Sequence, residues 1–356
     1  MNQQVFAAMS GGIDSSVAAY LLREAGYDTT GITMTLYNPN PTGDVSQDVL
    51  DARQVCTTLG IPHITCHMGE IFKSAVIEDF IATYEAGGTP NPCVVCNKRI
   101  KFGALWDEVQ AHGGDMIATG HYARVAVDGS GAPLLLKAVD ETKDQSYFLW
   151  QLKRDVLAHV LFPLGELTKP QIRAMGAEIN LPTAHKSDSQ DICFVPDGDY
   201  AAFMERYTGR VPVGGQFVDE DGRVLGQHKG MIHYTIGQRK GLGIALGTPM
   251  FVIGKDPAKN TVTLGSNDKL FARHVYLKDV NLLALDSLTQ PLRVCAKIRS
   301  THKGSMATLT PIDQTTALLV FDEAQRGAAM GQSAVFYDGD VVVGGGVITG
   351  HMTNGV

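Results

Sequence analysis

Serine, glycine and aspartate residues crowd into residues 10–16, which read SGGIDSS and directly follow a short apolar run. Glycines let backbone N–H groups approach phosphate oxygens closely, and the N-terminus of a following helix adds partial positive charge. The segment lacks the spacing and lysine of a Walker loop and has no G-x-G-x-x-G. The alternative is an ordinary strand-to-helix turn with Ser or Asp as the cap. Its place after the first buried strand favours a phosphate-binding loop, because α/β sheets bind ligands at that strand end.

Two cysteines, Cys93 and Cys96, follow two prolines and an asparagine within residues 89–102. The prolines predict a rigid, non-helical loop, after which Cys96 is expected to open a helix. The helix dipole and nearby cations would lower the pKa of that thiol; the cations are Lys98, Arg99 and Lys101. Half a zinc site and a thioredoxin-like redox pair are the alternatives. The sequence offers no second C-x-x-C or H-x-x-x-H, and the motif does not lie on the first strand.

A third cysteine, Cys193, follows the polar residues 187–191. Taken alone, its residue type favours a small buried hydrophobe, and the polar lead-in is the internal hint of chemistry. A chain of 356 residues does not need disulfide staples, and a cytosolic setting keeps thiols reduced. Paired cysteines here therefore point to catalysis or metal binding.

The bulk composition limits the class of protein. A length of 356 residues predicts two or three domains, and 44% hydrophobic with 19% charged residues is typical of folded cores. We find no basic start to the N-terminus and no run of 18 apolar residues, so we expect no signal peptide, no membrane span and a cytoplasmic location. The net charge of −7 argues against a general polycation but not against nucleic-acid binding, which depends on where the positive charge lies.

Strand and helix patterns alternate through residues 1–200. Apolar runs predict strands near residues 5–9, 31–36, 64–66 and 116–119. Helical periodicity predicts helices over residues 17–25, 49–59, 70–86 and 96–112, with Gly26 and Gly60 as stops. This alternation is typical of an α/β domain with a parallel sheet covered on both faces.

The pattern changes after about Tyr207, where glycines and short β-rich runs dominate. Hairpins are predicted around Asp256 and Pro257 and around Asp338 and Gly339. We expect a catalytic domain over residues 1–207, a small β-rich domain over 208–272 and a β-barrel over 273–356.

Residues 290–311 contain no acidic side chain but several basic ones, which are Arg293, Lys297, Arg299, His302 and Lys303. In a β-barrel this pattern favours a surface that follows RNA phosphates. A solvated strand face is the alternative.

Taken together, these segments resemble the bacterial tRNA-specific 2-thiouridylase (MnmA) family of the PP-loop ATP pyrophosphatases. The resemblance covers nearly the whole chain, and further matching segments lie at residues 120–124, 143–149, 237–243, 331–332 and 337–339. It implies an N-terminal PP-loop parallel sheet of the adenine nucleotide alpha hydrolase type, then a small β-rich domain and a C-terminal β-barrel. In this family AMP is transferred to the C2 oxygen of the wobble uridine of tRNA, and sulfur then arrives from a cysteine persulfide.

The resemblance also assigns residues. It implies an ATP site at Ala8, Met9, Ser10, Gly11, Gly12, Ile13, Asp14, Ser15, Met34 and Gly120. It implies Cys96 as nucleophile and Cys193 as persulfide carrier, joined by a transient disulfide. Contacts to the target base or the tRNA are implied at Asn91, Pro92, Cys93, His121, Lys143, Asp144, Gln145, Arg299, Ser300 and Gln332. Where the family commonly shows Arg-Tyr this chain has Arg299 and Ser300, which argues against aromatic stacking there.

The implied cofactors are ATP and Mg²⁺, with no metal site in the protein itself. The implied partners are the Lys, Glu and Gln tRNAs and a sulfur donor, either a cysteine desulfurase or a sulfur relay protein. Two other functions share parts of the pattern. A PP-loop ligase or amidotransferase would need no reactive cysteine, and a nucleotide-sensing RNA-binding protein would have lost catalysis. For His121 the alternative is a satisfied core histidine, and for Lys143 and Asp144 a solvated turn.

Overall fold

The computed structural model describes residues 3–37, 45–184, 186, 192–245 and 247–353. Its contacts divide the chain into two compact units. Unit 1 contains Met1–Val76, Cys93–Gln190 and Gly339–Val343, and unit 2 contains Ile77–Pro92, Asp191–Asp338 and Gly344–Val356. No helix in the described ranges is long and apolar enough to cross a membrane.

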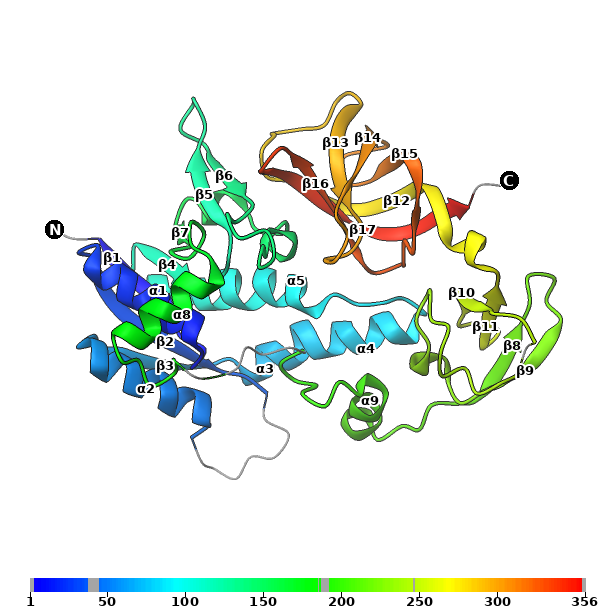
Figure 1. The fold of residues 1–356 in the computed structure, drawn as a ribbon, viewed down its shortest axis with the longest axis horizontal. Coiled ribbons are helices and arrows are strands. Elements are labelled where there is room, and N and C mark those ends of the chain that lie inside the picture. Colours follow the sequence, from blue (N-terminus) through cyan, green and yellow to red (C-terminus); the bar gives the residue numbers. More distant parts are fainter. Residues whose placement is uncertain (1–2, 38–44, 185, 187–191, 246, 354–356) are drawn as a thin grey trace. The chain divides into compact units, whose positions relative to one another are not determined.

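Unit 1 is built on a five-stranded sheet with the order β3-β2-β1-β4-β7 (Figure 1). All of its pairings are parallel, as the alternating pattern predicted. The strands are β1 (Gln4–Ala8), β2 (Asp28–Thr35), β3 (His63–His67), β4 (Met116–Thr119) and β7 (Val160–Leu161). From β1 the chain adds β2 and β3 on one side and later β4 and β7 on the other. The strand order therefore reverses at β1, which is where such sheets bind ligands.

Helices cover both faces of this sheet, which confirms the second part of the prediction. On one face, α1 (Ile13–Glu24) and α2 (Gln47–Leu59) share a buried apolar cluster with β1 and β4. On the other, α6 (Leu105–Ala111) packs so tightly that a Cβ on Gly114 would lie 2.5 Å from Val109 and 2.6 Å from Phe6. Both helices end where the glycines predicted: Gly26 follows the last turn of α1, and Gly60 caps α2 with a φ of 68°.

The other two predicted helices are less regular than periodicity predicts, and the second is also longer. The expected helix over 70–86 consists of α3 (Gly69–Phe72), a π-helical turn (Lys73–Ile77) and α4 (Glu78–Glu85). The expected helix over 96–112 begins earlier, because Pro92 takes the first position of α5 (Pro92–Cys96), where proline lacks only an amide the helix does not use. A π-helical stretch (Asn97–Ala104) then leads into α6. The prediction that Cys96 opens the helix is wrong.

Several elements of unit 1 were not predicted. These are the hairpin of β5 (Arg124–Val127) and β6 (Pro133–Leu136), a 3₁₀ turn (Ser146–Phe148), α7 (Arg154–Leu157) and α8 (Lys169–Glu178).

Unit 2 contains a small central sheet and a barrel. The central sheet has the order β10-β11-β8-β9, with strands β8 (Gly215–Val218), β9 (Val224–His228), β10 (Phe251–Asp256) and β11 (Thr261–Gly265). Its core gathers Phe217, Tyr234, Val252, Val262 and Leu264. Three short helical elements flank it: α9 (Tyr200–Thr208) and 3₁₀ turns at Met231–His233 and Asn267–Leu270.

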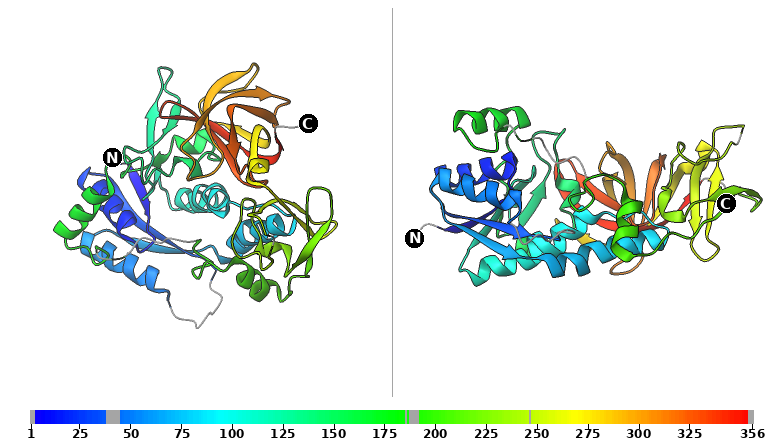
Figure 2. Two further views of the ribbon diagram at one scale, coloured as in Figure 1. Left: turned by 45° about the vertical axis from the view of Figure 1, so that its right-hand side comes forward. Right: turned by 90° about the horizontal axis from the view of Figure 1, so that it is seen from below.

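The barrel follows the order β12-β15-β14-β13-β16-β17, and pairing of β12 with β17 closes it. Its strands are β12 (Phe271–Leu282), β13 (Leu292–Lys297), β14 (Ser305–Pro311), β15 (Ala317–Arg326), β16 (Ser333–Asp338) and β17 (Val341–Thr353). Both predicted hairpins are present, at β10–β11 and at β16–β17 (Figure 2). The fold class predicted from the sequence is confirmed.

Candidate nucleotide loop and cysteine sites

The glycine-rich loop joins β1 to α1 at the reversal of strand order. Ala8 ends β1, Met9 is buried, and α1 begins at Ile13. Gly120 directly follows β4, and a Cβ there would lie only 2.8 Å from the backbone nitrogen of Ser15. Glycine at position 120 therefore allows the end of β4 to approach the first turn of α1. On the other side of the loop, Met34 lies near the carboxyl end of β2 and is half-buried.

Hydroxyl groups fix the shape of this loop. The Ser10 amide donates to the Ser15 Oγ at 3.1 Å, while the hydroxyls of Ser15 and Ser16 donate to the Gly12 carbonyl at 3.1 and 2.8 Å. Gly11 has a φ of +70°, and a Cβ at that position would lie 2.6 Å from the Asp48 carbonyl oxygen. Gly12, the N-cap of α1, has no side chain to occupy the first amides of the helix. The loop is thus preformed, with backbone donors of the kind that bind anions.

Lys169 and Tyr122 hold the acidic residue of the loop. Lys169 Nζ lies 2.7 and 2.9 Å from the two carboxylate oxygens of Asp14, and the Tyr122 hydroxyl donates to Oδ1 at 2.8 Å. The Lys169 side chain is only 9% exposed. This pair neutralises Asp14 on the first turn of α1, where an anionic ligand would otherwise meet a like charge. The sequence analysis missed both partners.

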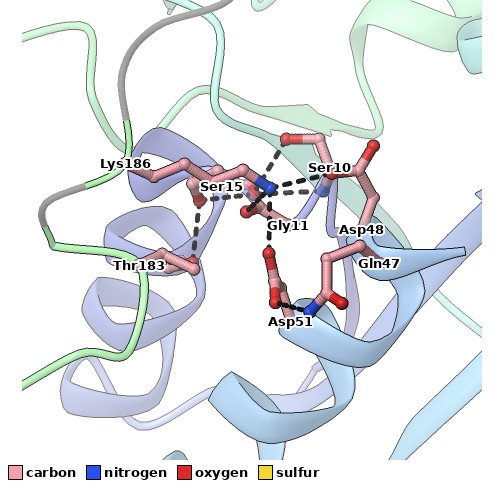
Figure 3. Close-up of polar contacts among 10 residues, drawn as sticks. Ser10, Gly11, Ser15, Gln47, Asp48, Asp51, Thr183 and Lys186 are labelled. Atoms are coloured by element: carbon pink, nitrogen blue, oxygen red, sulfur yellow. Dashed lines mark hydrogen bonds and ion pairs between the residues drawn. The ribbon is translucent and has the colours of Figure 1, made fainter.

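A second lysine, Lys186, lies directly on the loop (Figure 3). Its Nζ donates to the Gly11 carbonyl at 3.1 Å and pairs with Asp48 at 2.8 Å and Asp51 at 2.9 Å. Burial opposes the charged amine, but the hydrogen bonds that the amine donates to both carboxylates, and their charges, outweigh it and raise the pKa of Lys186. Gln47 donates to Asp51 at 2.6 Å and fixes one carboxylate. A cation is therefore held at the loop, and the sequence analysis did not identify it.

The two neighbouring cysteines differ in exposure. Cys93 is exposed on the first turn of α5, whereas Cys96 is buried at its last residue. Protein packed around Cys93 raises the pKa of its thiol, and the charge of Lys101 offsets part of that rise. The helix therefore presents Cys93, rather than Cys96, near its N-terminus.

Cys193 is exposed, so its interpretation as a buried small hydrophobe is wrong. The two following residues, Phe194 and Val195, are buried, and the Phe194 ring lies 5.3 Å from that of Phe80 and 5.2 Å from that of Phe203. The cysteine is thus presented at the surface directly beside an aromatic anchor. The polar lead-in at residues 187–191 lies outside the described residues.

The remaining cysteines are less exposed than Cys93 and Cys193. Cys56 and Cys66 are buried, and burial raises the pKa of each thiol to about 11. Cys295 is half-buried in the barrel. Among the described residues no group of three or more His, Cys, Asp and Glu could hold a metal ion.

Several residues assigned to tRNA contacts already have partners inside the protein. His121 is buried; its ring lies 2.6 Å from the Thr119 hydroxyl and 3.2 Å from Lys101 Nζ. Burial and the Lys101 charge hold the pKa of His121 well below its usual value, so the ring is neutral. The Asp144 carboxylate accepts from Ala138 and Ser146, and the Gln145 side chain accepts from the Tyr122 amide. Lys143 is half-buried in the same turn. A tRNA contact at these positions stays a prediction.

The basic stretch of the barrel is acid-free in sequence but not in space. Arg293 makes a bidentate pair with Asp322 on β15, at 2.8 and 2.7 Å. Arg299 donates to the Arg326 carbonyl at 2.6 Å, and Lys297 lies over the Tyr337 ring at 5.3 Å. Lys303 and Ser300 are exposed.

Three family models match the chain in order. They are the tRNA methyl transferase HUP domain over residues 3–197, the tRNA methyl transferase PRC-barrel domain over 201–266 and the Aminomethyltransferase beta-barrel domain over 272–348. A relative called tRNA-specific 2-thiouridylase MnmA, from Clostridioides difficile (strain 630), is 47% identical over 355 residues, which is 98% of each chain. The chain belongs to the MnmA family.

Other members agree with this assignment. The MnmA of Lachnoclostridium phytofermentans is 45% identical over 97% of this chain and 99% of its own, and that of Clostridium acetobutylicum is 46% identical over 98% and 100%. A solved 4-thiouridine synthetase–RNA complex with bound ATP is 17% identical, with a TM-score of 0.35 over 55% of this chain and 45% of its own, which is too distant to support any argument. The resemblance inferred from the motifs is confirmed, and the chain belongs to a family of enzymes. The ligase and non-enzyme alternatives are thereby set aside.

Proposed function

We propose that this MnmA family member uses ATP to convert the wobble uridine of tRNA to 2-thiouridine. The observation that carries the proposal is the combination of a preformed phosphate loop with an exposed cysteine in a chain whose relatives are named for this modification. The domain models carry methyl transferase names instead. An anion-binding loop suited to a nucleotide and a surface cysteine favour activation followed by sulfur transfer.

The first half of the reaction supplies a leaving group. The C2 oxygen of uridine attacks the α-phosphate of ATP, a C2–O–AMP bond forms, and pyrophosphate leaves. The amides at Gly11 and Gly12, the α1 N-terminus and the Lys186 amine are the groups that would stabilise pyrophosphate. Mg²⁺ is expected to accompany the nucleotide. The nearby carboxylates, Asp14, Asp48 and Asp51, are already ion-paired, so no step here is assigned to a protein-bound metal.

The second half replaces oxygen by sulfur. The terminal sulfur of a Cys193 persulfide attacks C2, and AMP leaves with the former carbonyl oxygen. A Cys96 thiolate then attacks the Sγ of Cys193 and breaks the S–S bond, which leaves the thiolated base and a Cys96–Cys193 disulfide. An external dithiol returns two electrons and regenerates both thiols. Because Cys96 is buried and Cys93 is exposed, Cys93 is the residue whose substitution tests this choice.

The partners of the reaction follow from the same chemistry. The substrate is an anticodon-loop base, which leaves its stack at a cost of about a few kcal/mol because such loops are partly unpaired. A cysteine desulfurase or sulfur relay protein would load Cys193. Domains over residues 1–207, 208–272 and 273–356 would provide catalysis, linkage and tRNA binding, in the cytoplasm.

The decisive experiment supplies ATP and an unmodified tRNA transcript and identifies the products. Pyrophosphate should form on adenylation. Once a persulfide donor is added, AMP should form in equal amount to pyrophosphate, and nucleoside mass spectrometry should detect 2-thiouridine. Formation of ADP and phosphate, or a methylated nucleoside from S-adenosylmethionine with no sulfur incorporated, would refute the proposal.

A further inference from the structure

The central sheet of unit 2 carries a basic loop at residues 237–243, which read GQRKGLG and precede β10. We call this segment the central loop. It lies within residues 222–255, a run that contains no Asp or Glu. Arg293 in the barrel shows that such a run can be neutralised by a carboxylate from another strand. The partners of each cation in the structure therefore decide whether the positive charge of this run persists.

The cations of this run differ in what they contact. Arg223 lies 3.5 Å from the Asp221 carboxylate, and the Lys255 amine donates to a backbone carbonyl at 3.0 Å. Arg239 and Lys240, in the central loop, are both exposed. Within the ranges that the structure describes, neither of these two side chains has an ion-pair partner. The two adjacent positive charges of the central loop are therefore not cancelled by the fold.

Hydrogen bonds to β10 and an apolar anchor hold the central loop in place. The Gly237 amide donates to the Val252 carbonyl at 2.8 Å, and the Val252 amide donates to the Gln238 carbonyl at 2.9 Å. The Gln238 side chain donates to the Lys240 carbonyl at 3.0 Å. Leu242 is buried in the core of the central sheet. The two cations are therefore displayed on a preformed turn, so binding does not have to order the backbone first.

The backbone of the central loop also suits an anion. Gly241 and Gly243 have φ angles of +76° and +73°, in the left-handed region that favours glycine. The amides of Lys240 and Gly241 have no protein acceptor among the described residues. Exposed amides beside left-handed glycines form concave donor sites for phosphate oxygens.

Arg326, on β15 of the barrel, lies beside the central loop. A Cβ on Gly237 would be 3.6 Å from Arg326 Nη1. The Arg326 guanidinium lies 5.5 Å from the centre of the Phe251 ring and donates to Asn267 Oδ1 at 3.1 Å, and no carboxylate of the described residues pairs with it. The Arg326 carbonyl accepts from Arg299 at 2.6 Å. Arg326 therefore joins the central loop to the basic stretch of the barrel.

We propose that the central loop and Arg326 form a phosphate-contact surface, which continues the basic stretch of the barrel and binds the sugar–phosphate backbone of tRNA. Successive cations that extend over two domains match a polymer with one negative charge per nucleotide. An acidic protein fits less well, because protein interfaces have an apolar core, whereas the large apolar side chain of the loop, Leu242, is buried. The choice of tRNA as the polymer rests on the proposed function.

The test uses a loop variant, which carries Arg239→Gln and Lys240→Gln in one chain. Binding of an unmodified tRNA transcript is measured at several salt concentrations, without ATP and without a sulfur donor. The Kd should rise about tenfold at a fixed salt concentration, and the slope of log K against log salt should fall by about 1–2 units, because about two phosphate contacts are lost. A protein with Arg239→Lys and Lys240→Arg keeps both charges and should keep the wild-type slope.

The matched control removes the same charge from another part of the central sheet. It carries Arg223→Gln and Lys259→Gln, whose side chains are exposed and pair with Asp221 at 3.5 Å and Asp256 at 3.3 Å. Its slope should equal that of wild type, because these cations are already neutralised. A control that loses as much slope as the loop variant would show that net charge alone matters and would overturn the proposal.

Activity measurements separate this surface from the proposed function. With saturating tRNA, kcat of the loop variant should stay within about twofold of wild type, while the KM for tRNA rises about tenfold. Wild-type protein that binds tRNA but forms no 2-thiouridine would refute the proposed function and leave the binding result standing. A loop variant with wild-type tRNA affinity and slope would overturn the surface proposal. If its KM for a protein sulfur donor were then raised, the loop would be a protein-docking surface instead.

Discussion

The glycine-rich loop and the basic stretch of the barrel were both inferred from short runs of sequence. The loop has the strand–loop–helix geometry that was predicted, whereas the basic stretch is less positively charged in the structure than its sequence suggests. In the loop, the strand end, the glycines and the helix start are consecutive, so geometry follows from order along the chain. In the barrel, a carboxylate from another strand reaches the acid-free stretch, since Asp322 on β15 pairs with Arg293. Backbone-based sites are therefore local in sequence, whereas a surface field depends on side chains brought together by the fold.

The largest expected effect separates the nucleotide loop from the cysteines. Cys193→Ser and Cys96→Ser should each abolish 2-thiouridine formation while pyrophosphate is still released, because adenylation needs neither thiol. Cys56→Ser and Cys295→Ser are the controls and should retain activity. The measurement is nucleoside mass spectrometry beside a pyrophosphate assay. A Cys193→Ser protein with near wild-type thiolation would refute the persulfide assignment, and loss with Cys93→Ser but not Cys96→Ser would reverse the roles of the pair.

A second prediction concerns the cation on the loop. Lys186→Met removes the amine and leaves two carboxylates, Asp48 and Asp51, beside the phosphate site. The KM for ATP should rise about tenfold or more, because like charges would oppose the nucleotide. Lys259→Met, at an exposed lysine paired with Asp256, is the control and should not change KM. An unchanged KM in Lys186→Met would mean that this lysine only fastens its own segment to the loop.

A third prediction tests how far the Asp14 pair supports the fold. Lys169→Met leaves the Asp14 carboxylate with Tyr122 but no cation. The free energy of unfolding should fall by about 1–3 kcal/mol, which is less than for a fully buried ion pair because Asp14 is partly exposed. Chemical denaturation measures the loss. The double variant Lys169→Met, Asp14→Asn should recover part of it, and a double variant no more stable than the single one would argue against an unpaired charge as the cause.

A fourth prediction uses the neutral His121. Its folded-state pKa is depressed by burial and by Lys101, whereas the unfolded chain titrates near the ordinary value of about 6.5. Its contribution is therefore fully present above pH 6.5 and is lost as the pH falls below it, at up to about 1.4 kcal/mol per pH unit. His121→Gln should show a shallower decline of unfolding free energy between pH 6.5 and 5 than wild type. Parallel curves would indicate that His121 is protonated in the folded protein.

The smallest expected effect tests whether the basic stretch of the barrel contacts RNA phosphates. Lys297→Ala with Arg299→Ala should lower the slope of log K for tRNA against log salt by about 1–2 units. Arg293→Ala should leave the slope unchanged, because Asp322 already neutralises that side chain. Binding at several salt concentrations gives the slopes. Equal slopes for all three proteins would show that the stretch is a solvated strand face.

The sequence was sufficient for elements whose signals are local. The parallel sheet, the helix stops at Gly26 and Gly60 and both predicted hairpins follow from periodicity and turn residues. The start of the cysteine helix was misplaced because two prolines were interpreted as a loop, although proline also opens helices. The β5–β6 hairpin was not predicted.

The side-chain pairs at the glycine-rich loop could not be predicted from the sequence, because the two partners of each pair are far apart along the chain. Lys169 lies 155 positions from Asp14, and Lys186 lies 175 positions from Gly11. No pattern within one segment identifies such a partner. The hydrogen bonds from Gln332 to the Thr89 and Pro90 carbonyls are equally distant in sequence, since Gln332 follows these residues by more than 240 positions.

The division of the chain into units has a consequence for its synthesis. Unit 1 includes Gly339–Val343, where Val341 pairs with Leu136 and Asp340 pairs with Arg124. Translation produces the chain from its N-terminus, so the five-stranded sheet can form early, but unit 1 stays incomplete until residue 343 has emerged. During much of translation, β6 in the nascent chain therefore lacks its pairing partner β17. A truncated product ending before residue 339 would keep that edge and be a target for quality control.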